Sequence, residues 1–545
     1  MATILGINAV FHDPAAALVV DGETVAAAEE ERFSRRKHGK EPVPFSTWEL
    51  PVDAMHWCLD HAGLEPGDVD VVAYSYDPDL APPSNGNITD DEWEGLRTLY
   101  VRRVPGFLAT ALPGLPTERL EYVAHHVAHA ASACVAAPHD SSAVLVLDGR
   151  GEVASHLSGR WRGGTLDVLA GQRLPHSLGL LYEEVTAHLG FRRSSDEYKV
   201  MALASYGEPE RFGPVFRENV GATGDGGFGV RPMDLAALAP VRRPGEGWSA
   251  IHADLAAALQ VRLEEVVLDL ARWLHQRTGE RAITLAGGVA LNCVANGRLA
   301  AEGPFDNVWV QPAAGDAGTA LGAALAATTR RGQTCTPLGT AALGRGWADS
   351  EIEAILKAAD QPYERPSDLA GTVATALAGG AVVGWFQGRS EYGPRALGHR
   401  SLLCDPRRPG NLNRMNAIKG REEFRPVAPM VLAERAAEIF DGVQPSPYML
   451  FVHRIRPEWT DRIPAVVHID GTARIQTVDA ADEPLVAAML RAFERCSGVP
   501  VVVNTSFNTA GRPMVDTPQQ ALECFGSGPI DLLALGPFVV RRARG

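Results

Sequence analysis

The stretch "TILGINAVFHDPAAALVVDGETVAAAEEERF" (residues 3–33) predicts a strand, a polar loop and a hairpin that turns at Asp21. A related pattern recurs in "SSAVLVLDGRGEVASHLSGRWRGGTLDVLAGQRL" (residues 141–174), where a second hairpin turns at Gly163. Two meanders of strands that each open with an acidic loop indicate a duplicated lobe, because internal repeats of this kind define an architecture. The alternative is that two unrelated hairpins look alike.

The rest of the first 340 residues alternates helices with strands. Helical patterns cover about 46–63, a segment from about 124, and 248–279, whereas the Pro-, Asn- and Asp-rich segment 81–105 predicts a surface loop. A strand, a glycine-rich turn and a helix follow in "AITLAGGVALNCVANGRL" (residues 282–299). We therefore expect an α/β fold in which a duplicated, two-lobed domain of the actin-like or hexokinase-like kind comes first.

A second domain follows a Gly-, Pro- and Thr-rich segment at about 335–350, where the composition predicts a boundary. Helical patterns then alternate with apolar strands, as expected of a further α/β domain. We place the domains at 1–342 and 343–545.

Composition narrows the class of protein. The chain has 545 residues, 46% hydrophobic, and a net charge of −15, which disfavours nucleic acid as a partner. None of its seven cysteines forms a Cys-x-x-Cys pair, which favours a reducing compartment. The N-terminal sequence lacks the pattern of a signal peptide, and we find no apolar run of about 18 residues, so we expect a cytoplasmic protein without a membrane span.

Three histidines stand at the start of the segment "YVAHHVAHAASACVAA" (residues 122–137). On a helix, His125 and His129 share one face, whereas His126 is turned about 100° away. A two-histidine metal site needs further ligands, and Asp148 and Asp316, each following an apolar strand, are the best candidates. Two imidazoles with two carboxylates suit Fe²⁺, Mn²⁺ or Zn²⁺. From spacing alone, a buried and hydrogen-bonded histidine pair is an equally good interpretation.

Glycine-rich turns in the first domain are candidates for nucleotide binding, because such turns let the backbone approach a phosphate. Neither turn is a Walker loop, and each is a weak signal alone. A lysine inside an otherwise apolar run is a further candidate, with a helix-end lysine as the alternative. These residues are Gly149, Gly151, Lys199, Gly287, Gly288 and Asn292.

The second domain carries arginines among glycine, proline and apolar residues, in "GRSEYGPRALGHRS" (388–401), "AIKGREEFRPVAP" (417–429) and "GTARIQTV" (471–478). Arginine binds phosphates and carboxylates through two parallel hydrogen bonds, so this pattern favours an anion site over a solvated surface. The residues singled out are Arg395, Lys419, Arg425, Arg474, Asn504, Ser506 and Asn508.

A set of segments spread over almost the whole chain matches a known family in the same order: "FHDPAAALVVDG", "HHVAHAASA", "LVLDGRGE", "AGGVALN", "GDAGTALGAA", "GPRALGHRSLL", "FRPVAP" and "VVVNTSFN". In these segments the chain resembles the O-carbamoyltransferase family. The resemblance implies an actin-like domain followed by a YrdC-like domain. It also implies that ATP, with Mg²⁺, and carbamoyl phosphate give carbamoyladenylate in the second domain, and that the first domain transfers the carbamoyl group to a hydroxyl.

The same resemblance assigns roles to single residues. It implies that iron is bound by His125, His129, Asp148 and Asp316. It also implies that His12 is the general base and that Lys37 lies near the nucleotide. It assigns the arginine-rich residues of the second domain to carbamoyl phosphate and adenylate binding.

The acceptor stays open at this stage. A sugar hydroxyl of an antibiotic-type natural product, such as a glycopeptide, aminoglycoside, macrolide or ansamycin, is the expectation, and segments 80–120 and 207–247 match no family motif. The oligomeric state is open too. The alternatives are a tRNA threonylcarbamoyl transferase, an actin-fold small-molecule kinase and a nucleotide-binding regulatory module.

Overall fold

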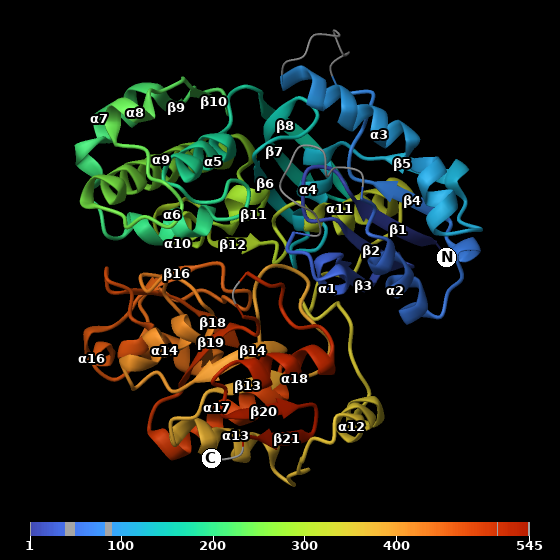
Figure 1. Cartoon of the computed structure of the whole chain (residues 1–545). Helices are drawn as coiled ribbons and strands as arrows, with labels where there is room; N and C mark the ends of the chain where they lie inside the picture. The colour runs from blue at the N-terminus through green and yellow to red at the C-terminus, as the bar shows by residue number, and fades with distance from the viewer. Residues whose placement is uncertain (1, 39–48, 82–89, 510, 543–545) are drawn as a thin grey trace. The chain divides into compact units, whose positions relative to one another are not determined.

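The computed structural model describes residues 2–38, 49–81, 90–509 and 511–542. The chain forms two compact units, Met1–Leu338 and Gly339–Gly545, and each is of the α/β class (Figure 1). The boundary between them thus lies four residues before the one placed from sequence composition.

The first unit contains the same five-stranded sheet twice. The orders are β3-β2-β1-β4-β5 and β8-β7-β6-β11-β12, and in both sheets the first two pairings are antiparallel and the last two parallel. The first sheet comprises β1 (Thr3–Asn8), β2 (Ala15–Val20), β3 (Glu23–Glu29), β4 (Val71–Tyr74) and β5 (Leu120–Tyr122). The second comprises β6 (Ser141–Leu147), β7 (Ala154–Arg162), β8 (Thr165–Arg173), β11 (Ala282–Ala286) and β12 (Asn307–Val310). The predicted duplicated, actin-like lobes are confirmed.

Helices and a small hairpin complete the unit. The hairpin strands are β9 (Val220–Ala222) and β10 (Phe228–Val230). The helices are α1 (Glu31–Ser34), α2 (Val52–Ala62), α3 (Asp90–Ala111), α4 (His125–Cys134), α5 (Leu178–His188), α6 (Glu197–Ala204), α7 (Gly213–Asn219), α8 (Leu235–Leu238), α9 (Ala250–Thr278), α10 (Cys293–Glu302) and α11 (Ala317–Arg330).

Two of these helices, α4 and α11, cross between the lobes. Helix α4 follows the first sheet but packs on β6, β7 and β11 of the second, and α11 follows the second sheet but packs on β1, β2 and β4 of the first. The two helices also pack against each other (Figure 1). Their approach is close because Gly322 of α11 lies directly against the backbone of α4, where a Cβ would collide with the carbonyl oxygen of Ala128.

The surface loop predicted for 81–105 is wrong over most of its length, because Asp90–Ala111 forms helix α3. Residues 82–89 lie outside the described part of the chain. Tyr100, Val101, Val104 and Leu108 recur every three or four residues and are buried, so their packing outweighs the proline within the helix. Polar composition at the start of the segment hid this apolar stripe.

The second unit is built on a seven-stranded sheet in the order β18-β15-β19-β14-β13-β20-β21. Its strands are β13 (Val383–Phe386), β14 (Arg400–Cys404), β15 (Ala428–Leu432), β18 (Gln476–Val478), β19 (Val501–Ser506), β20 (Leu532–Leu535) and β21 (Phe538–Arg541), and a separate pair is β16 (Val452–Arg454) with β17 (Thr472–Arg474). The helices are α12 (Asp349–Ala358), α13 (Leu369–Ala378), α14 (Gly410–Ile418), α15 (Ala433–Ile439), α16 (Pro457–Thr460), α17 (Pro484–Ser497) and α18 (Pro518–Ser527).

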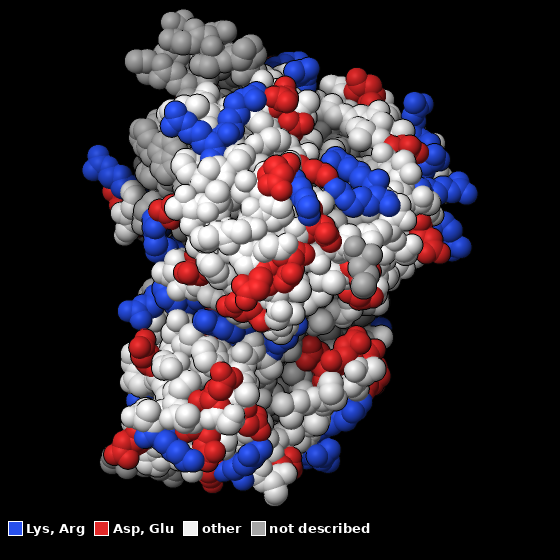
Figure 2. Space-filling view, turned by 90° about the vertical axis from the view of Figure 1, so that its right-hand side faces the viewer, with Lys and Arg blue, Asp and Glu red and all other residues white. Residues whose placement is uncertain are grey.

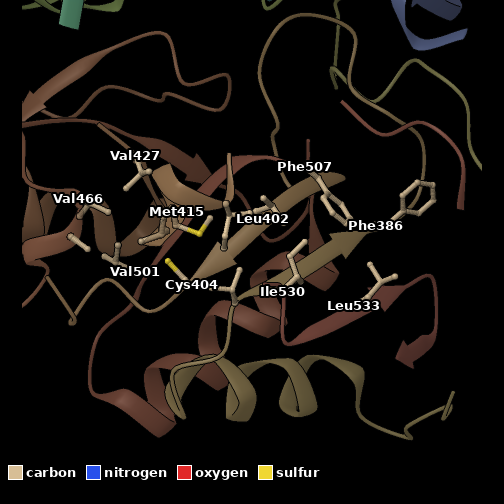
Figure 3. Packing of buried hydrophobic residues seen from close by; sticks show 14 of the residues in the cluster. Phe386, Leu402, Cys404, Met415, Val427, Val466, Val501, Phe507, Ile530 and Leu533 are labelled. Carbon is tan, nitrogen blue, oxygen red and sulfur yellow. The ribbon is translucent and has the colours of Figure 1, made fainter. Parts of the chain in front are cut away.

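Apolar side chains cover both faces of this sheet. Leu402, Val501 and Val503 belong to the core in Figure 3, whereas their neighbours Leu403 and Val502 belong to the core beneath α13 and α17. Successive residues of a strand point to opposite faces, which explains why these strands are apolar throughout. The sheet is therefore a rigid layer from whose loops polar side chains can project.

We expect Gly322→Ala to destabilise the first unit, because the added methyl group must push α4 away from α11. Overpacking of this kind costs roughly 1–3 kcal/mol in free energy of unfolding. Gly106→Ala in α3 is the matched control, since a Cβ there meets no atom within 4 Å. Chemical denaturation should show a loss for Gly322→Ala only; equal stability of the two variants would contradict the close crossing of α4 and α11.

Candidate metal centre and active site

Four predicted ligands meet in one buried cluster of the first unit. The Nε2 atoms of His125 and His129 lie 3.5 Å and 3.8 Å from Asp148 Oδ2, and 3.6 Å and 3.5 Å from Asp316 Oδ1. Each residue offers one ligand atom, and these four atoms lie within 4.8 Å of one another. A tetrahedral site with bonds of about 2.1 Å has ligand atoms about 3.4 Å apart, so the spacing fits one metal ion.

The hydrogen bonding of the cluster also fits a metal ion. Both Nε2 atoms and Asp316 Oδ2 are buried without a hydrogen-bond partner among the described residues. Buried polar atoms without partners are costly, and the two Nε2 atoms face the same two carboxylate oxygens, an arrangement that a bound cation satisfies. These residues could therefore hold a cation; the donor set by itself does not distinguish Fe²⁺ from Mn²⁺ or Zn²⁺.

Neighbouring groups orient the ligands. His125 Nδ1 donates to the carbonyl oxygen of Ser75 at 3.2 Å, which leaves Nε2 as the ligand nitrogen. Gly288 N–H donates to Asp148 Oδ1 at 2.8 Å, so Oδ2 is the oxygen that faces the imidazoles. Glu152 Oε1 accepts the backbone N–H of His125 at 2.8 Å and thereby caps the start of α4.

The cluster is strongly coupled electrostatically. Burial lowers the pKa of His125, but the carboxylates of Asp148 and Asp316, which lie 3.5 Å and 3.6 Å from its Nε2, raise it well above its ordinary value. Burial raises the pKa of Asp316, but the positive charge of His12 and the two imidazoles beside Asp316 bring it well below the usual range. The Asp316 carboxylate is thus ionised, and its negative charge is balanced by the protonated imidazole of His125. A bound metal ion would supply that positive charge in place of the proton.

His126 has a different environment, as its position on the helix predicts. Burial, followed by the nearby positive charge of His125, lowers the pKa of His126 to about 3. Its ring lies where a Cβ on Gly151 would be, so it fills space between α4 and the loop after β6. We assign it to packing rather than to the ligand set.

The predicted base, His12, lies beside this cluster. Its Nε2 is 3.8 Å from Asp316 Oδ2, and its side chain is 36% exposed, in contrast to 3% for Asp316. Burial lowers the pKa of His12, but the charges of Asp316 and Asp13 raise it to about 10. A cation bound by the carboxylates would offset that effect, which a base requires. Lys37 lies with its Nζ 6.0 Å from the centre of the Tyr198 ring.

Of the residues predicted for nucleotide binding, Gly288 contacts Asp148 and Gly149 follows Asp148 in the chain, and several of the others make contacts within the protein. The N–H groups of Gly151 and Gly287 donate to the carbonyls of Ala154 and Ala314. Asn292 caps α10 and exchanges two hydrogen bonds with Gln260. Lys199 lies 3.1 Å from Asp196, and Gly149 lies in the loop after β6. Their role with nucleotide stays a prediction.

In the second unit, three predicted residues form one polar cluster. Lys419 Nζ donates to Ser506 Oγ at 2.9 Å and to the side chain of Asn508, and Ser506 Oγ donates to Asn508 Oδ1 at 2.9 Å. Lys419 is buried at the end of α14, whereas Ser506 ends β19. The oxygens of Ser506 and Asn508 accept the hydrogen bonds of the Lys419 ammonium group, which is what allows a buried lysine to stay charged; whether the cluster binds an anion stays a prediction.

The remaining predicted residues of the second unit lie on its strands and the adjoining loops. Asn504 Nδ2 donates to the carbonyl of Ala396 at 3.0 Å, which ties the loop carrying Arg395 to β19. Arg425 lies 3.6 Å from Glu422, and Arg474 ends β17, whose neighbour β18 belongs to the same sheet as β19. Whether these residues form one site, and which ligand they bind, stays a prediction.

Sequence reasoning missed several contributors. Ser75 and Glu152 orient His125, Asp13 contacts His12, and His38 contacts Asp13. Glu391 accepts the backbone N–H groups of Leu397, His399 and Arg400, which shapes the arginine-rich loop. None of them belongs to a spacing pattern, although Glu152 and Asp13 stand next to predicted residues.

Comparison with known proteins decides the family. The model "Carbamoyltransferase N-terminus" matches residues 3–82, 108–223 and 236–325, and "Carbamoyltransferase C-terminus" matches 374–542. The chain belongs to the carbamoyltransferase family. As the resemblance implied, it is a carbamoyltransferase.

Relatives match over most of their length. The chain is 39% identical to protein sll1178 of Synechocystis sp., described as uncharacterized, over 99% of this chain and 97% of that protein. It is 38% identical to nodulation protein NolNO of Sinorhizobium fredii over 98% and 80%. Among solved structures, T. kodakarensis HypF matches with a TM-score of 0.36 and 14% identity over 62% of this chain and 48% of that one.

The charged surface and the length of the helices were the subject of two further expectations, on nucleic acid and on membrane spans. Acidic and basic side chains both lie on the face in Figure 2. Among the described helices, none combines the length and the apolar character that crossing a bilayer requires.

We expect His129→Ala to weaken metal binding at least about 10- to 100-fold, the range seen when even an outer partner of a ligand is lost. Elemental analysis after dialysis against a metal buffer measures the occupancy. His126→Gln, one position from His125 on the same helix, should keep the metal content of the wild type. Equal occupancy in wild type and His129→Ala would refute the ligand set.

Proposed function

We propose that this carbamoyltransferase forms carbamoyladenylate in the second unit from ATP and carbamoyl phosphate. The first unit then transfers the carbamoyl group to a hydroxyl of a small-molecule acceptor. The observation that carries the proposal is the pairing of a buried His/Asp metal cluster with an adjacent, partly exposed histidine, His12, in a chain whose family matches cover both units.

The chemistry of the first step suits the residues of the second unit. Both substrates are polyanions, and Arg395, Lys419, Arg425 and Arg474 supply positive charge around a rigid sheet. With one water, the balanced step consumes ATP and carbamoyl phosphate and yields carbamoyladenylate, pyrophosphate and phosphate. Mg²⁺ accompanies ATP in this proposal, as it commonly does in nucleotide sites.

The second step needs a base and a stabilised leaving group. His12 takes the proton of the acceptor hydroxyl at Nε2 while the hydroxyl oxygen bonds to the carbamoyl carbon, and AMP leaves. When bound by His125, His129, Asp148 and Asp316, iron, the metal that the family resemblance favours, would supply Lewis-acid stabilisation for the phosphate of the departing AMP. We assign Lys37, Lys199 and the glycine turns to the nucleotide.

The acceptor in this proposal is a natural product of antibiotic biosynthesis with a sugar hydroxyl. The N-terminal family model matches most of segment 207–247, contrary to the expectation from its motifs, and leaves residues 224–235 unmatched. We assign acceptor recognition to these residues, which include strand β10. The proposed site of action is the cytoplasm. A screen of glycopeptides, aminoglycosides, macrolides and ansamycins for products heavier by one carbamoyl group identifies the acceptor by mass spectrometry.

We expect the purified enzyme to convert ATP to AMP only when carbamoyl phosphate is present, because adenylate formation releases pyrophosphate. Chromatography of the nucleotides measures this. ADP as the product would instead support a small-molecule kinase with the same actin-like lobes.

Two variants separate the steps. Arg395→Ala should abolish AMP formation, whereas His125→Ala should retain adenylate formation, detected as carbamoyl-phosphate-dependent pyrophosphate release, and lose transfer. Loss of both steps in His125→Ala, with an unchanged melting temperature, would contradict this division of the reaction between the units.

A further inference from the structure

A chain of hydrogen bonds begins at His12 and leads away from the metal cluster. His12 Nδ1 lies 2.8 Å from Asp13 Oδ2, and Asp13 Oδ1 lies 2.9 Å from His38 Nδ1. His38 Nε2 in turn lies 2.8 Å from Ser195 Oγ. The chain joins three loops of the first unit: the one after β1, the one after α1 and the one before α6.

The direction of these hydrogen bonds follows from the central carboxylate. Asp13 is ionised, since its pKa lies below the usual range despite burial, because of the positive charges of His38 and His12. An ionised carboxylate only accepts hydrogen bonds, so both Nδ1 atoms carry the donated proton. His38 Nε2 then makes the next hydrogen bond of the chain, to Ser195 Oγ.

The backbone around the chain is held in an uncommon conformation. Phe11, Asp13, His38 and Ser194 have φ values of 60°, 51°, 63° and 56°, in the left-handed region that favours glycine. Such residues cost roughly 1–3 kcal/mol each and cluster at functional sites. Buried Asn8 fixes the first loop, because its Nδ2 donates to the carbonyls of His12 and Asp13 at 3.0 Å each.

A second metal site is the competing interpretation, since Asp13, Glu31 and His38 also lie close enough to share a cation. Their atoms, however, already have partners: Glu31 Oε2 accepts the N–H of His38 at 2.8 Å, and both oxygens of Asp13 accept from imidazoles. In the four-residue cluster, by contrast, both imidazole Nε2 atoms lack partners. Hydrogen bonding alone therefore accounts for this group.

We propose that Asp13 is a positioning residue for His12, and that His38 and Ser195 hold Asp13 in place. The proposal deepens the proposed function and rests on the role of His12 in it. Because Asp13 accepts from Nδ1, the nitrogen that exchanges a proton with the acceptor is Nε2, on the side of Asp316. A carboxylate orients the imidazole of a Ser-His-Asp triad by the same principle.

The hydrogen-bond chain from His12 to Ser195 also links the two lobes. Asp13 and His38 belong to the loops of the first lobe, whereas Ser195 lies in the second, between α5 and α6. The orientation of His12 is therefore complete only when the two lobes bring Ser195 onto His38.

Nuclear magnetic resonance of the full chain tests the orientation directly. The protein is labelled with ¹⁵N-histidine and loaded with Zn²⁺, a diamagnetic ion that takes histidine and carboxylate ligands. His12→Gln assigns the His12 signal among the 16 histidines. We expect the wild type to show a proton on Nδ1 of His12, and Asp13→Asn to lose this single state, because an amide can donate as well as accept.

Asp21→Asn is the matched control, since Asp21 is also an aspartate with a left-handed backbone, φ 52°, but lies in the β2–β3 turn. It should leave the His12 signal unchanged. If Asp13→Asn does not fold, His38→Gln provides the second variant, and it should broaden or shift the same signal. A His12 signal identical to that of the wild type in a folded Asp13→Asn or His38→Gln protein overturns the proposal.

The failure of this inference is distinguishable from that of the proposed function. Carbamoyl-phosphate-dependent AMP formation by the wild type tests the proposed function. If the wild type forms no AMP, the imidazole signals still report whether Asp13 orients His12. In Asp13→Asn, pyrophosphate release in the second unit should stay within about twofold of the wild type. A tenfold or larger loss there would show that the variant acts through general misfolding and would contradict a local positioning role.

Discussion

The close crossing of α4 and α11 is the constraint on which the candidate site depends. It brings the two lobes' equivalent positions face to face: α4 follows the last strand of the first sheet, and α11 follows the last strand of the second. His125 and His129 start α4, and Asp316 precedes α11. Asp148 follows β6, just as His12 follows β1. The two lobes thus share one backbone plan, and they place different side chains at equivalent positions of the site.

Electrostatics explains why this position favours a cation. The starts of two helices carry partial positive charge, which by itself would repel a metal ion. Two buried carboxylates, Asp148 and Asp316, outweigh that positive charge, and they raise the pKa of His125 well above its ordinary value. Burial lowers the pKa of His12, but Asp316 and Asp13, with a smaller contribution from Asp148, raise it to about 10, so base chemistry at His12 requires that the charge of Asp316 be offset.

Sequence alone predicted what periodicity and repetition encode. The two meanders gave the duplicated lobes, and the spacing of His125 and His129 gave a shared helix face that the structure confirms. Helix α3 was missed because polar residues at its start concealed an apolar stripe. Asp13, His38 and Ser195 were missed because their contact spans 157 positions between His38 and Ser195, and no local pattern records such a pairing.

Anomalous diffraction from crystals of the protein as purified, collected on both sides of the iron absorption edge, locates the metal ion. We expect one iron peak among the imidazoles of His125 and His129 and the carboxylates of Asp148 and Asp316. We expect no peak among Asp13, Glu31 and His38. A peak at that second group, or crystals with iron in solution and no peak between α4 and α11, would refute the metal site at the four residues.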